Sequence, residues 1–141
     1  MNKIIEIENK KYKLVGENYE LIKENNDVDE RIIFFNKWNN EKYCLEAVKK
    51  DGYSLQFVKE QTEEICLIAV KGNGDSLQYV KEQTEEICLI AVKQNGDLLR
   101  FVKEQTKKIC LKAVKQNRDS LRFVKSKLIF EKITGLKIKE N

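Results

Sequence analysis

The sequence repeats itself every 22 residues across its middle. The stretch Cys66–Ile87 reads CLIAVKGNGDSLQYVKEQTEEI, and nearly the same letters precede it at Cys44–Ile65 and follow it at Cys88–Ile109. A fourth copy begins at Cys110 and keeps the register as far as Lys125. A fixed period of this length is typical of repeat proteins, in which each unit packs only against its neighbours. The chain is therefore predicted to be a stack of repeats.

Each unit has two related halves, which we interpret as two short helices forming a hairpin. The motif L-x-A-V-K at Leu67–Lys71 is echoed by L-x-Y-V-K at Leu77–Lys81. We expect a first helix from about Glu63 to Lys71 and a second from about Asp75 to Glu82. Such short helices are marginal alone, so stacking on neighbours must stabilise them. The predicted fold is mainly α, with short α-helical hairpins stacked as a small solenoid.

Turn and capping residues separate the two helices. Asn73 and Gly74 follow the first helix, where a residue with positive φ often ends a helix. Asp75 or Ser76 is then expected to cap the second helix. The first helices of successive units are predicted to be capped by threonines, namely Thr62, Thr84 and Thr106.

Comparison between units separates an inward from an outward face. The positions that stay apolar in every full copy fall on one arc of the first helix and are predicted to be buried: Ile65, Cys66, Ala69 and Val70. The position of Ile68 varies instead, and holds Glu46, Ile90 and Lys112 in the other units. Packing does not dictate a position that varies in this way, so we expect it to be exposed.

The repeats resemble a known family. The motifs CLEAVKKDG, CLIAVKQNG and SLQYVKEQT are similar to a family of short tandem repeats in bacteria and large DNA viruses, catalogued as a domain of unknown function. The resemblance covers roughly Tyr43 to Lys125. It implies an α-helical repeat and no assigned activity. In that family a proline often follows the Tyr-Val pair, whereas this chain has Lys59, Lys81 and Lys103, so the second helix is expected to run slightly longer.

The two ends depart from the repeat. Alternating apolar and charged residues in Lys3–Val15 predict a β-hairpin, expected to cap the first helices. Gly16–Asn25 matches a degenerate second helix, and Asp29–Trp38 a bulkier first helix. A closing helix is predicted to end at Gly135. The resulting single domain has three parts: an N-terminal β-hairpin and degenerate helical cap (1–43), four helical repeats (44–125), and a C-terminal capping helix with a basic tail (126–141).

The four cysteines occupy one equivalent position of the repeat. Stacked helices lie about 8–10 Å apart, whereas a disulfide needs Cα atoms within about 7 Å. Zinc ligands must converge on one point, and the chain has no histidine. We therefore interpret each cysteine as a small buried hydrophobic residue, with no metal.

The composition favours a soluble, non-enzymatic protein. The chain is 41% hydrophobic and 35% charged, and no apolar run is long enough to span a bilayer or to form a signal peptide. We expect a cytoplasmic location. No nucleophile beside a base, phosphate loop or metal spacing occurs, so neither catalysis nor a cofactor is predicted.

The first functional hypothesis is a module that binds a protein or nucleoprotein partner through the solenoid surface. Ile68 and Ile90 support it, because both are apolar at a position expected to be exposed. Trp38 and the pair Phe34–Phe35 have two interpretations, as packing in the cap or as an aromatic anchor for the partner. The monomer is favoured. A narrower version is a phage or mobile-element inhibitor of a bacterial defence complex.

The alternative hypothesis is nucleic-acid or nucleoprotein binding through a basic C-terminal end. Residues 100–141 carry 13 Lys and Arg against 4 Asp and Glu, a balance of +9, whereas the other 99 residues carry 14 against 19, a balance of −5. The repeat aromatics are expected to be buried, which leaves none to stack on bases. The predicted basic patch consists of Arg100, Lys107, Lys108, Lys115, Arg118 and Arg122.

Overall fold

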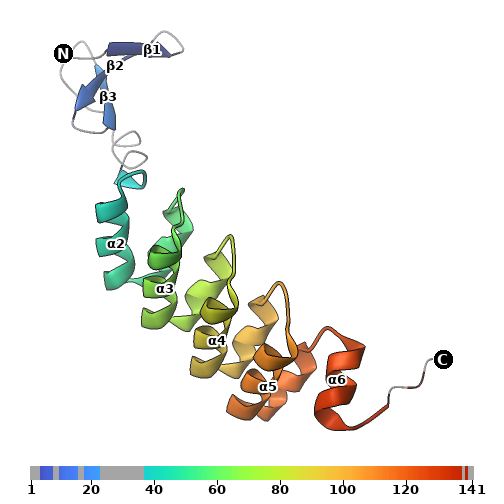
Figure 1. Ribbon diagram of the computed structural model, residues 1–141. Helices are drawn as coiled ribbons and strands as arrows, with labels where there is room; N and C mark the ends of the chain where they lie inside the picture. Colours follow the sequence, from blue (N-terminus) through green and yellow to red (C-terminus); the bar gives the residue numbers. More distant parts are fainter. Residues whose placement is uncertain (1–3, 8–9, 16–17, 23–36, 138, 140–141) are drawn as a thin grey trace.

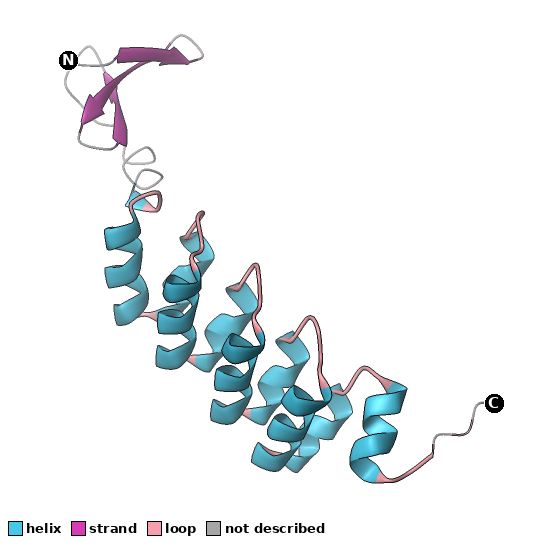
Figure 2. Cartoon of the chain, viewed as in Figure 1, coloured by secondary structure: helices cyan, strands magenta, loops and turns pink. Residues whose placement is uncertain are grey.

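A computed structural model of the chain describes residues 4–7, 10–15, 18–22, 37–137 and 139 (Figures 1 and 2). This part of the chain is mainly helical, and its helix pairs pack in tandem, which confirms the predicted repeat fold. The α-helices are α2 (Glu41–Lys50), α3 (Glu63–Gly72), α4 (Glu85–Gln94), α5 (Lys107–Gln116) and α6 (Lys127–Thr134). Short 3-10 helices follow the first four of them: η1 (Gly52–Phe57), η2 (Gly74–Tyr79), η3 (Gly96–Phe101) and η4 (Arg118–Phe123).

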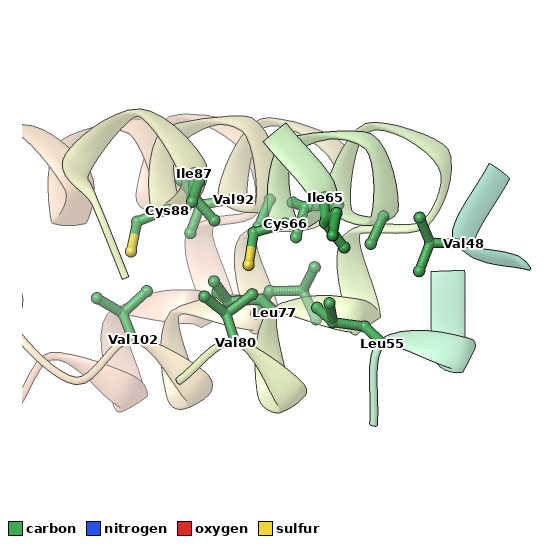
Figure 3. Close-up of a cluster of buried hydrophobic side chains, with 14 of the residues drawn as sticks. Val48, Leu55, Ile65, Cys66, Leu77, Val80, Ile87, Cys88, Val92 and Val102 are labelled. Carbon is green, nitrogen blue, oxygen red and sulfur yellow. The ribbon is translucent and has the colours of Figure 1, made fainter. Parts of the chain in front are cut away.

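The helices form two layers with the core between them. Each α-helix from α2 to α5 packs on the next, and the 3-10 helices form a second row that does the same. Figure 3 shows apolar side chains of the two rows meeting in between. The α-helices contribute the positions predicted to be buried, and Ala69 and Val70 are both 0% exposed. Burial of this continuous apolar layer stabilises helices that are too short to be stable alone.

The predicted threonine caps are confirmed. The hydroxyl of Thr62 accepts a hydrogen bond from the Ile65 amide at 3.3 Å, and Thr84 and Thr106 cap α4 and α5 in the same way. Glu63 follows in the first turn of α3, where its charge opposes the positive end of the helix dipole. The caps fix where each α-helix begins.

The second helix of each unit differs from the prediction in type, length and cap. It is a 3-10 helix that ends at Tyr79, because Val80 is extended (φ −70°, ψ 118°) and is buried in the core. The lysine that replaces the family's proline therefore does not lengthen the helix. The cap is Asn73, whose side chain accepts from the Asp75 amide at 3.0 Å, and neither Asp75 nor Ser76 has this role.

The glycines before the 3-10 helices have a steric role, and the expectation of positive φ was wrong. Asn73 has φ −150°, and Gly135 is the one glycine with positive φ in the described part. A Cβ on Gly52 would lie 2.7 Å from the Ala69 carbonyl oxygen of the next unit. Neighbouring units thus approach too closely for any side chain. The fourth unit has Arg118 here, where the repeats end and α6 follows.

Glutamine side chains connect successive units. The amide nitrogen of Gln83 donates to the Phe101 carbonyl at 3.0 Å, and its oxygen accepts from the Lys103 backbone amide at 2.9 Å. Gln61 and Gln105 make equivalent bonds. These bonds satisfy backbone groups in the extended segments after the 3-10 helices, where no helix or sheet is available to do so.

The N-terminal segment contains three antiparallel strands in the order β1-β2-β3, namely β1 (Ile4–Ile7), β2 (Lys10–Val15) and β3 (Asn18–Ile22). The degenerate helix predicted over Gly16–Asn25 is wrong for β3, where Tyr19 pairs with Leu14 and Leu21 with Tyr12. Alternation of period two outweighed the match to the repeat. The bulky helix expected over Asp29–Trp38 lies mostly outside the described residues, and a capping role for the hairpin stays a prediction.

The C-terminal helix ends as predicted. Ser126 caps α6, and Gly135 adopts a left-handed conformation (φ 73°) after its last turn. Of the basic tail after Gly135, the structure describes residues 136, 137 and 139, whereas 138, 140 and 141 lie outside the described residues. No helix in the described ranges is long and apolar enough to cross a membrane.

Candidate functional site

A surface groove of about 880 Å³ lies between α4 and α5, on the side of the molecule that the α-helices form. It arises because the two helices pack side by side through their buried faces and leave their outward faces to form the walls. Its lining comes from equivalent positions of the two helices, namely Glu85, Glu86, Leu89, Ile90 and Lys93 of α4, and Lys107, Lys108, Leu111, Lys112 and Lys115 of α5.

Three apolar side chains form the floor of the groove. Leu89, Ile90 and Leu111 are half-buried, and Leu89 and Ile90 pack against the edge of the core. Ile68, one repeat earlier on α3, is half-buried as well. The expectation that Ile68 and Ile90 are exposed is therefore correct only for part of each side chain, because the neighbouring helix covers the rest.

The rim of the groove is basic. Lys108 donates to Glu85 at 3.0 Å, and this hydrogen bond holds the pKa of the Glu85 carboxyl below its ordinary value. Within the described part of the chain, four further ammonium groups of the rim form no salt bridge, those of Lys93, Lys107, Lys112 and Lys115. The charges of these exposed ammonium groups are available to pair with an acidic partner.

The structure divides the predicted basic patch between the two layers. Lys107, Lys108 and Lys115 line the groove, whereas Arg100, Arg118 and Arg122 belong to the row of 3-10 helices. Two of these arginines already have intramolecular contacts. Arg122 pairs with Asp97 at 3.4 Å and lies 4.7 Å from the Phe123 ring, and Arg100 lies 4.6 Å from the Phe101 ring. The six residues therefore do not form one patch.

A column of lysines after the 3-10 helices has a structural role. The ammonium group of Lys81 donates to the Lys59 carbonyl at 2.6 Å, and that of Lys125 donates to the Val102 carbonyl at 2.8 Å. Lys103 contacts the preceding unit in the same way. These lysines connect units, so their charges are less available to a partner than those on the groove rim.

The aromatic residues differ from the prediction in their burial. Trp38 is only 7% exposed and packs 5.2 Å from the Tyr43 ring, as the cap-packing interpretation expects. Phe57, expected to be buried, is 44% exposed. Its equivalents in the later units are half-buried, because the core of the 3-10 layer consists of leucine and valine. These equivalents of Phe57 are Tyr79, Phe101 and Phe123. Phe34 and Phe35 lie outside the described residues.

The cysteines are buried, as predicted, and are at most 3% exposed. Burial raises the pKa of all four thiols, that of Cys88 to about 11. The thiol of Cys88 donates to Gln83 at 3.7 Å. Protonated, enclosed thiols are poor nucleophiles. No group of three metal-binding side chains occurs among the residues that the structure describes.

Comparison with known families agrees with the repeat architecture. A family model described as "Domain of unknown function (DUF4116)" matches residues 40–84, 62–107 and 84–129. The chain belongs to this family. The matches start 22 residues apart, so each DUF4116 match spans two helix pairs and shares one with the next. Neither a curated protein nor a solved structure matches this DUF4116 chain.

Sequence reasoning missed six residues of the DUF4116 groove. Beside the predicted Ile90 and the three predicted lysines, it is lined by Glu85, Glu86, Leu89, Lys93, Leu111 and Lys112. The signal was available, because they occupy the outward arc of the first helix in the same register. The prediction treated each helix separately and did not consider that the outward faces of two neighbouring helices together form a groove.

Proposed function

We propose that this DUF4116 chain is a non-enzymatic interaction module that binds a protein partner across the outward face of its α-helices. The observation that carries the proposal is the groove between α4 and α5, with its apolar floor and charged rim. Solenoids commonly bind partners along an extended face. Half-buried apolar side chains surrounded by charged groups are also the composition expected of a protein interface with a polar rim.

Nucleic-acid binding is the second candidate, supported by the lysines of α5. Three features make it the weaker one. The groove lining contains no aromatic side chain for base stacking, and Glu85 and Glu86 place negative charge at one end. Arg122 is already paired with Asp97. The narrower hypothesis, an inhibitor of a bacterial defence complex, stays a hypothesis.

The test is capture of partners from the source organism by the immobilised chain, with and without nuclease. We expect a protein that stays bound after nuclease treatment and is lost from the Ile68→Glu/Ile90→Glu variant, which places one charge on the apolar floor and one at the equivalent position of α3. The control is Lys49→Glu/Lys50→Glu, because both residues are exposed at the end of α2, outside the groove. Circular dichroism checks that each variant folds.

Two outcomes would contradict the proposal. Equal capture by the wild type and the Ile68→Glu/Ile90→Glu variant would show that the outward face is not the binding surface. Binding to plain RNA that weakens steeply with salt, and is lost in Lys107→Glu/Lys108→Glu, would favour nucleic acid, since each neutralised phosphate releases counterions.

A further inference from the structure

The outward face changes its charge from one pair of helices to the next. Between α3 and α4, the ten positions equivalent to the groove lining hold four Glu and two Lys, a balance of −2. Between α4 and α5 they hold two Glu and five Lys, a balance of +3. The reversal comes from α5, where Lys107 and Lys108 replace Glu85 and Glu86 and Lys112 replaces Ile90.

The fold does not require this reversal. Glu63-Glu64 and Glu85-Glu86 begin α3 and α4, where glutamate favours the helix dipole. Lysine at the same first-turn positions of α5 opposes that dipole. The threonine cap and the buried face of α5 are otherwise those of the earlier units. Lys108 gains only the exposed pair with Glu85, which contributes little to stability in water, and Lys107 forms no salt bridge within the described part of the chain. Local stability therefore gives little reason for the two lysines, and a negatively charged partner would give one.

The apolar floor selects between kinds of negatively charged partner. Covering Leu89, Ile90 and Leu111 lowers the free energy only when the covering group is itself apolar. A nucleic-acid backbone has no such group to place there. An acidic polypeptide can place apolar side chains on the floor and carboxylates against the ammonium groups of Lys107, Lys112 and Lys115. Paired charges at such a rim add specificity and association rate.

The groove also limits the length of the bound segment. α4 and α5 each have 10 residues, which makes each helix about 15 Å long. A segment lying along them would be covered over about 10 residues if helical, or about 5 if extended. This is a short linear segment and not the face of a large domain.

We propose that the groove between α4 and α5 binds a short acidic segment of a partner protein, with apolar side chains on Leu89, Ile90 and Leu111 and carboxylates along the lysines of α5. This inference rests on the proposed function and names the chemistry of its partner. It also assigns the binding to one pair of helices, because the surface between α3 and α4 has the opposite charge.

The test selects ligands without assuming their sequence. A display library of random peptides of about 12 residues, slightly longer than the groove, is selected on the full chain. It is counter-selected on Lys107→Glu/Lys108→Glu/Lys112→Ile, which gives α5 the outward face of α4. The enriched peptides are expected to be net negative with clustered apolar residues. A labelled peptide from this set should lose about tenfold or more in affinity for the triple variant.

Matched controls separate charge position from total charge. Lys49→Glu/Lys50→Glu reverses two charges on α2 and should leave peptide affinity within about twofold. A peptide of glutamates alone should bind more weakly than the selected peptide, because it cannot cover the floor. Lys112→Glu/Lys115→Glu gives a second test with unchanged residues in the first turn of α5, should the triple variant fail to fold.

Three results would overturn the inference. The selected peptides could be neutral or basic, their affinity could be unchanged in both groove variants, or a single-stranded RNA could bind more tightly than any of them and be lost in the same variants. The experiments distinguish a failure of this inference from a failure of the proposed function. A partner lost in Ile68→Glu/Ile90→Glu, with selected peptides that are not acidic, would leave the proposed function standing and refute this inference.

Discussion

The surfaces between α3 and α4 and between α4 and α5 have the same backbone and nearly the same core, yet opposite charge. Ile87, Cys88 and Ala91 of α4 are buried like Ile109, Cys110 and Ala113 of α5. On the outward face, Glu85, Glu86 and Ile90 of α4 are replaced by lysines in α5, whereas Lys93 is matched by Lys115. The difference teaches that inward positions determine the fold, whereas outward positions can change without affecting it and are therefore where a function would be encoded.

The largest effect on stability is expected from the close approach of neighbouring units. In Gly96→Ala, the new Cβ would meet the carbonyl oxygen of Ala113, which is backbone and cannot move aside. We expect a loss of about 1–3 kcal/mol in the free energy of unfolding. Gly72→Ala is the control, because nothing lies within 4 Å of its Cβ position and Gly72 ends α3. It should gain about 0.5–1 kcal/mol. Urea denaturation measures both.

A smaller effect is expected from two equivalent serines. Ser120 donates to Asp97 at 3.1 Å, whereas the buried hydroxyl of Ser76 has no hydrogen-bond partner among the described residues. The reason is that Tyr53 occupies the position equivalent to Asp97. Ser120→Ala should therefore cost about 1 kcal/mol, and Ser76→Ala should be neutral or slightly stabilising. Equal losses in urea denaturation would contradict this explanation of the two interfaces.

The buried thiols should make stability depend on alkaline pH. Burial raises the pKa of Cys88 from 9.0 to about 11, so the folded chain keeps a proton that the unfolded chain releases in this range. The contribution to stability is complete below about pH 9 and is lost as the pH rises toward about 11. Cys88→Ala should show a smaller decrease between these values. An unchanged pH profile of the denaturation midpoint would show that the thiol is not the titrating group.

The smallest effect on stability is expected from the outward charges. Lys107→Glu/Lys108→Glu removes the exposed pair with Glu85 and restores the residues of the preceding units. We expect Tm to change by no more than about 2 °C in thermal unfolding followed by circular dichroism. A large loss would mean that the lysines of α5 stabilise the fold, and would remove the argument that they serve a partner.

The sequence predicted the repeat, the α-helices with their threonine caps, and the buried face, because each depends on local pattern and on a strict period. It could not predict the 3-10 geometry, since that depends on how closely units stack at Gly52 and its equivalents. It also missed β3, because a partial match to the repeat hid the alternation of Tyr19 and Leu21. For the candidate site, Ile90 and three of the four lysines of α5 were identified, but only the packing of α4 on α5 joins them into one groove.

The most direct test of the central claim locates the bound peptide on the chain by methyl NMR. The full chain is titrated with an acidic peptide from the selection, and methyl signals of the two equivalent surfaces are compared. We predict that Ile90 and Leu111 shift strongly, whereas Leu67 and Ile68 of α3 shift little. Shifts at Leu67 and Ile68 equal to or larger than those at Leu111 would contradict the claim that the basic groove between α4 and α5 is the binding surface.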